Sequence, residues 1–108
     1  ESGGTPVLTY FSNTHQTQGT ARQMLSFSLD STLAYSNMNG ELHLFNPSST
    51  TFIKNFYAIT QYYHGVGTGT SVNPFTAGYF NTTSAIDAIS FKYESGNITG
   101  QISLFGIS

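Results

Sequence analysis

The sequence predicts an all-β protein that folds as a single jelly-roll-like β-sandwich of about seven short antiparallel strands. Apolar side chains recur at every second position in short segments bounded by turn residues, and no segment has a convincing helical period. Only 7% of the 108 residues are charged and 15% are aromatic, a composition that suits strands better than exposed helices. A chain of this length builds one hydrophobic core. We therefore expect a linker or arm at residues 1–5 and one domain over residues 6–108.

Two strands are expected in the first 30 residues. Residues 6–11 are a short strand candidate that begins at Pro6, where the missing N–H costs least. Residues 12–21 are polar and indicate a loop. Over residues 22–29, apolar side chains alternate with Ser and Asp, which predicts a half-buried strand.

The next expected strand lies between two turns. Residues 37–40 predict a turn, because the dipeptide Asn39-Gly40 is a strong hairpin signal. Residues 41–45 follow as a strand with both leucines on one face. Residues 46–49, with the sequence Asn-Pro-Ser-Ser, predict a second turn.

The longest expected strand, or two strands joined by a bend, covers residues 51–63. Both of its faces carry apolar side chains, which is typical of a central strand or of one covered by a neighbouring subunit. We therefore expect the chain to self-associate, as a trimer in the first instance, through apolar side chains of this segment. The candidate interface residues are Phe52, Ile53, Phe56, Tyr57 and Ile59.

A contact with a partner or a glycan is expected where this strand gives way to a loop. Tyr62, Tyr63 and His64 lead into a glycine–threonine run, and residues 64–71 have the low complexity of a surface loop. Tyrosine offers a broad amphipathic contact, and glycine lets a loop adapt to its target. The open alternative is a connector that binds nothing.

Three further strands are expected in the last third of the chain, at residues 74–80, 86–93 and 100–105. The last of them alternates cleanly. Ile102 and Leu104 share one face and are expected to point into the core, so that Leu104→Asp would abolish soluble folding.

Composition argues against several classes of partner. The formal net charge is −2 and only three cations are spread along the chain, so a phosphate-binding face for nucleic acid is not expected. No apolar run approaches the roughly 20 residues that span a bilayer, and membrane insertion is not expected. The chain lacks cysteine, so disulfides and thiolate metal sites do not arise.

No catalytic constellation stands out, and we expect neither enzymatic activity nor a cofactor. His15, His43 and His64 are far apart in the sequence and lack the spacing of a zinc motif. Glycoside hydrolysis needs two carboxylates that face each other, and nothing in the sequence brings Glu41 and Asp87 together. A Gly-x-Ser-x-Gly elbow is absent.

Three segments together resemble a domain of tailed-phage virion proteins, namely a C-terminal β-sandwich. They are residues 40–54, residues 77–91 and residues 95–107, mostly hairpin ends and turns. The resemblance implies a non-enzymatic β-sandwich in a virion, in tail fibres, collars or capsid appendages, often assembled as trimers. It supplies no catalytic residues to carry over.

The expected function is therefore that of a structural or adhesion domain of a bacteriophage virion, such as a tail fibre or surface appendage. Its expected partners are copies of itself, other virion proteins and a glycan of the host surface. The alternative is a carbohydrate-binding module of a secreted or cell-surface protein that uses exposed tyrosines. Oligomeric state discriminates the two, since a monomer with a row of exposed tyrosines favours sugar binding.

Overall fold

The structure is a computed structural model that describes residues 5–16, 18–26, 29, 32, 34–65 and 69–107. Parts of four expected features lie outside these residues: positions 1–4 of the expected linker, position 17 of the expected loop at 12–21, positions 27 and 28 of the expected strand at 22–29, and positions 66–68 of the expected loop at 64–71.

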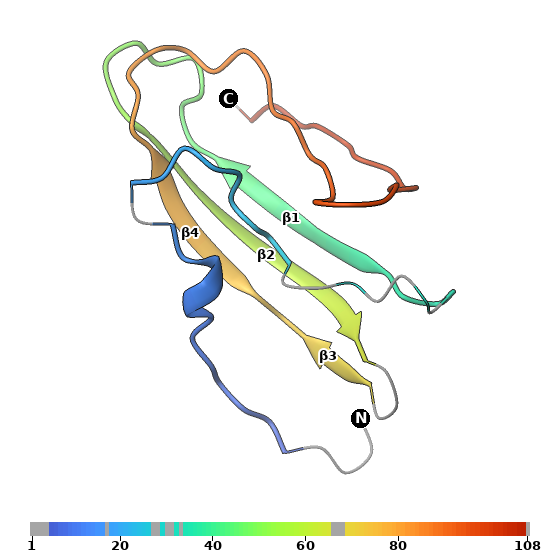
Figure 1. Cartoon of the computed structure of the whole chain (residues 1–108). Helices are drawn as coiled ribbons and strands as arrows, with labels where there is room; N and C mark the ends of the chain where they lie inside the picture. Colours follow the sequence, from blue (N-terminus) through green and yellow to red (C-terminus); the bar gives the residue numbers. More distant parts are fainter. Residues whose placement is uncertain are drawn as a thin grey trace.

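The described chain forms one antiparallel sheet of four strands, with a single turn of 3-10 helix, η1 (Ser12–Thr14), before it (Figure 1). The strands are β1 (Met38–Leu44), β2 (Lys54–His64), β3 (Thr70–Val72) and β4 (Phe75–Phe80). β2 is central, with β1 on one side and both β3 and β4 on the other. The all-β prediction is thus confirmed, and so is the central position that the two apolar faces of residues 51–63 indicated.

β3 and β4 lie end to end along β2 and keep the same register. Tyr62 opposes Val72 in one ladder and Ile59 opposes Phe75 in the next, so the alignment is unbroken across Asn73 and Pro74. Thr60 N donates to Pro74 O at 3.1 Å, but proline has no N–H to return. The two short strands are therefore one row of the sheet in which Pro74 removes a ladder bond.

One face of the sheet, here called the covered face, holds the core. The buried residues of β2 alternate along the strand and point to this face. They are Lys54, Phe56, Ala58, Thr60 and Tyr62. Irregular N-terminal chain crosses this face (Figure 1), and Thr60 Oγ1 donates to Leu25 O at 2.5 Å. Phe11 and Met24 line the same small gap as Pro74 and Thr76, which places this N-terminal chain against β4.

Removing the Thr60 hydroxyl should loosen the N-terminal cover. We expect Thr60→Val to lower the free energy of unfolding by about 1–2 kcal/mol, because it leaves the Leu25 carbonyl without its donor. Urea denaturation measures the loss, and limited proteolysis should cut residues 18–26 sooner. Thr99→Val, at an exposed position, is the matched control. Equal midpoints for the two variants would contradict the role of this bond.

The connection between β1 and β2 is fixed by hydrogen bonds to Ser49 and Lys54. Ser49 N donates to Asn46 O at 3.0 Å, which confirms the turn expected at residues 46–49. Ser49 Oγ accepts from the backbone N–H groups of Thr51 (3.1 Å) and Phe52 (3.0 Å). The fully buried Lys54 ammonium donates to three carbonyls. They belong to Ser49 (2.5 Å), Phe52 (3.0 Å) and Thr82 (3.2 Å). One side chain thus holds the turn, the start of β2 and the chain after β4 together.

The hairpin turn expected at Asn39-Gly40 is wrong, because both residues lie inside β1. Gly40 opposes Thr60, and a Cβ on Gly40 would stand 2.5 Å from Ile59 O and 2.8 Å from Thr60 Cα. Glycine is needed here because it has no Cβ, which lets β1 and β2 approach closely. The prediction of a turn relied on a different property of glycine, its freedom to adopt positive φ.

The expectation of about seven strands is also wrong for the described residues. Within them, no strand forms at the positions expected to carry four of the seven, namely residues 6–11, 22–29, 86–93 and 100–105. Ile102 and Leu104 do not reach the core, with exposed fractions of 67% and 88%. Alternation favours a strand only where a neighbouring strand supplies hydrogen bonds, and these segments find none within the described chain.

Candidate functional site

The face of the sheet opposite the covered face, here called the open face, carries the candidate site. Odd-numbered residues of β1, β2 and β4 point to it because side chains alternate along a strand. Its ring-bearing and apolar members are His43, Phe45, Tyr57, Ile59, Tyr63, Phe75, Ala77 and Tyr79. Its amide and carboxylate members are Asn39, Glu41, Asn55, Gln61 and Asn73.

A row of rings crosses the three rows of the sheet on this face. His43 stacks on Tyr57, with ring centroids 4.6 Å apart and an interplanar angle of 15°. Tyr57 stacks in turn on Phe75 at 6.0 Å and 18°, and Phe45 tilts against Tyr57 at 5.9 Å and 38°. Phe75 is 68% exposed and Phe45 48%, so the outer rings of the row are accessible.

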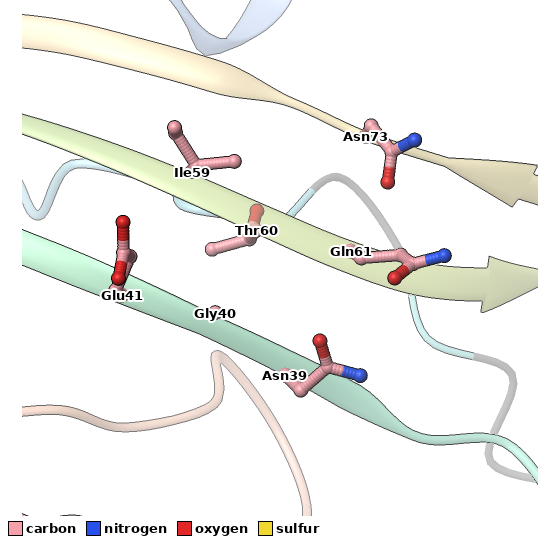
Figure 2. A pocket seen from close by; sticks show the side chains of 7 residues that line it. All are labelled: Asn39, Gly40, Glu41, Ile59, Thr60, Gln61 and Asn73. Carbon is pink, nitrogen blue, oxygen red and sulfur yellow. The ribbon is translucent and has the colours of Figure 1, made fainter.

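A hollow lined mainly by polar residues adjoins this row of rings. It is open to one side, has a volume of about 460 Å³, and is lined by Asn39, Gly40, Glu41, Ile59, Thr60, Gln61 and Asn73. Figure 2 shows the amides of Asn39, Gln61 and Asn73 side by side across the three rows of the sheet. Ile59 and Glu41 lie further along the same strands. Amides from adjacent strands supply this hollow with several hydrogen-bond donors and acceptors.

The open face has little net charge. Glu41 Oε1 lies 3.3 Å from His43 Nε2, and both side chains are partly exposed. Such a surface pair contributes little to stability. The face therefore offers a ligand ring stacking, amide hydrogen bonds and one carboxylate, that of Glu41. Within the described residues, no group of three His, Cys, Asp or Glu side chains could hold a metal ion.

The expected contact residues Tyr62, Tyr63 and His64 do not form one cluster. β2 continues to His64, so alternation places Tyr62 and Tyr63 on opposite faces. Tyr62 is only 3% exposed, on the covered face. The Tyr63 ring meets Tyr35 edge-on at 5.8 Å and lies so close over Gly69 that a Cβ there would overlap it. His64 is exposed at the end of the strand.

The expected interface residues are also divided between the two faces. Phe56 is buried on the covered face, where its ring packs 5.2 Å from that of Phe80. Tyr57 and Ile59 lie on the open face. Phe52 and Ile53 precede β2 and are exposed beside the turn. The five residues therefore do not make a single surface.

Sequence reasoning missed the rings outside β2 that complete the open face. His43, Phe45 and Phe75 come from segments that were expected as strands, but no register was available to align them. Once the strand register is known, the odd-numbered residues of β1, β2 and β4 are seen to share one face, and this would have grouped these rings together.

Comparison with known proteins adds no further information on the site. The sequence matches no family model, and neither curated proteins nor solved structures give a match. Within the described residues, no helix has the length and apolar character needed to cross a membrane.

Proposed function

We propose that this chain is a non-enzymatic adhesion domain that binds a neutral glycan on the open face of its sheet. The observation that carries the proposal is the juxtaposition of exposed rings and a hollow lined by amides on one face. Neither feature alone would single out a sugar. Together they match a ligand that has apolar C–H faces and a rim of hydroxyl groups.

The chemistry of each part fits such a ligand. The exposed ring of Phe75 offers a flat apolar surface for the C–H face of a pyranose. Asn39, Gln61 and Asn73 carry both donors and acceptors, which pair with hydroxyl groups without a charge on the ligand. A hollow of about 460 Å³ lies within the usual range of small-ligand sites.

The proposed setting is a bacteriophage virion, as part of a tail fibre or surface appendage. It rests on the resemblance of residues 40–54, 77–91 and 95–107 and on the low charge, which tolerates close contact between copies. In this setting we propose a homo-oligomer, a trimer in the first instance, in which further strands complete a jelly-roll-like sandwich. The second candidate is a carbohydrate-binding module of a secreted or cell-surface protein, and the same open face would serve it.

A glycan array with Phe75→Ala as the test variant examines the proposal. We expect the wild-type protein to retain neutral oligosaccharides and Phe75→Ala to bind them about five- to tenfold more weakly, because one stacked ring contributes about 1 kcal/mol. Phe52→Ala is the matched control, since Phe52 is similarly exposed (66%) but lies beside the turn before β2. Equal loss in both variants, or no retained glycan, would contradict glycan binding at this face.

A further inference from the structure

Residues 101–107 carry several apolar side chains that do not pack against the sheet and are exposed. Leu104, Phe105 and Ile107 are 88%, 82% and 91% exposed, and Ile102 is also exposed. None of them lies in a strand, although the segment alternates as a strand would. Exposed apolar residues this close together in sequence usually mark a site of contact.

The chain before this segment is anchored, and the segment itself is not. Ile86 N donates to Pro47 O at 2.8 Å, and Arg22 Nη1 donates to the Ser90 carbonyl and hydroxyl at 3.2 Å each. Beyond Ser90, no hydrogen bond joins the described residues 91–107 to the rest of the described chain. At roughly 3.3 Å per residue, residues 91–107 in an extended conformation would span on the order of 50 Å, which is enough to reach a neighbouring molecule.

Among the described residues, no strand pairs with the outer edge of β1. Phe45 N donates to Asn55 O and Tyr63 N donates to Asn37 O, so the odd-numbered residues of β1 exchange hydrogen bonds with β2. The backbone groups of the even-numbered residues therefore point outward. Those residues are Met38, Gly40, Leu42 and Leu44. Within the described chain, no backbone hydrogen bond reaches this edge from another segment.

The β1 edge carries few of the features that usually protect one. Native edges are blunted by charged side chains, especially lysine, by proline or by a covering segment, whereas β1 contains neither lysine nor proline and has Glu41 as its one carboxylate. Figure 1 shows the C-terminal chain on the β1 side of the sheet, drawn as a trace that runs out and turns back without joining the sheet. Residues 101–107 contain no charged side chain, so nothing electrostatic opposes their approach to such an edge.

We propose that residues 101–107 of one copy add as a strand to the β1 edge of a second copy. Ile102 and Leu104 would then extend the half-buried row formed by Leu42 and Leu44 on the covered face. The added strand would satisfy the outward backbone groups of β1 and bury side chains that are exposed in the single chain. This inference goes beyond glycan binding and does not depend on it.

Amide hydrogen exchange of the full chain, measured by NMR at two protein concentrations, tests the proposal. The amides of Gly40, Leu42 and Leu44 should exchange fast in dilute protein and become at least tenfold slower at high micromolar concentration. The amides of Glu41 and His43, which bond to β2, should be protected at both concentrations. Protection of the even-numbered amides at both concentrations would indicate pairing within one chain, and protection at neither would indicate no added strand. Either result overturns the proposal.

A pair of variants tests the donor segment by sedimentation velocity. Leu104→Asp should fold as the wild type does, because Leu104 is 88% exposed, but it should weaken self-association at least tenfold. Ser103→Asp is the matched control, with the same added charge one position away on the opposite side of the donated strand. If both variants self-associate as strongly as the wild-type protein does, the proposal is contradicted. If Leu104→Asp does not fold, the exchange experiment on the wild-type protein tests the proposal by itself.

Discussion

Gly40→Ala should be among the most destabilising single-methyl changes in this protein, lowering the free energy of unfolding by about 2–3 kcal/mol. The added Cβ would stand 2.5 Å from Ile59 O and 2.8 Å from both Thr60 Cα and Thr60 Cγ2. Two of these atoms belong to the backbone of β2, which is held by ladder bonds on both sides. Relief would therefore require β1 to separate from β2.

The Gly40→Ala measurement has a close control in the same chain. Gly100→Ala adds the same methyl group where no heavy atom lies within 4 Å. It should change the free energy of unfolding little, or raise it slightly by restricting the unfolded chain. Urea denaturation of both variants gives the comparison. Similar midpoints would show that β1 does not approach β2 as closely as described.

Lys54→Met should lower the free energy of unfolding by about 2–4 kcal/mol. Methionine has nearly the same length and fills the same space, but it leaves the carbonyls of Ser49, Phe52 and Thr82 without their shared donor. A hydrogen bond to a charged group contributes about 1.5–3 kcal/mol, and the three bonds of Lys54 are partly buried. Removing a buried ammonium also removes its desolvation cost, which offsets part of the loss. The turn before β2 and the chain after β4 should both loosen.

Chemical denaturation with Lys92→Met as the matched control checks the Lys54 prediction. Lys92 is exposed and makes no hydrogen bond in the described chain, so its replacement should leave the midpoint within about 0.5 kcal/mol of the wild type. A Lys54→Met protein as stable as Lys92→Met would mean that the three carbonyls are satisfied in another way.

The sequence was informative where one segment carried its own signal. The two apolar faces of residues 51–63 indicated a central strand or one covered by a neighbouring subunit, and β2 is central. The Asn-Pro-Ser-Ser run at 46–49 predicted a turn that is present. Both features are local, because they depend on alternation or on turn propensity within a few residues. The strand expected at residues 74–80 is also present, shortened to Phe75–Phe80 by the proline at its start.

Prediction failed where a feature depended on a distant segment. Asn39-Gly40 has the composition of a hairpin turn, yet both residues lie in β1, where Gly40 packs closely against the backbone of β2. Residues 100–105 alternate as well as β4 does, but no neighbour pairs with them in the described chain. The open face required the register that aligns His43 with Tyr57, which no single segment encodes.

Mapping of a bound sugar onto the sheet tests the central claim that the open face is the binding face. We expect titration with neutral trisaccharides of glucose, galactose or N-acetylglucosamine, followed by NMR of the backbone amides, to shift resonances around Tyr57, Phe75, Gln61 and Asn73. Amide resonances of the N-terminal chain on the covered face, such as those of Met24 and Leu25, should stay in place. Shifts confined to the covered face or to residues around His64, or no shift with any of the three sugars, would contradict the account.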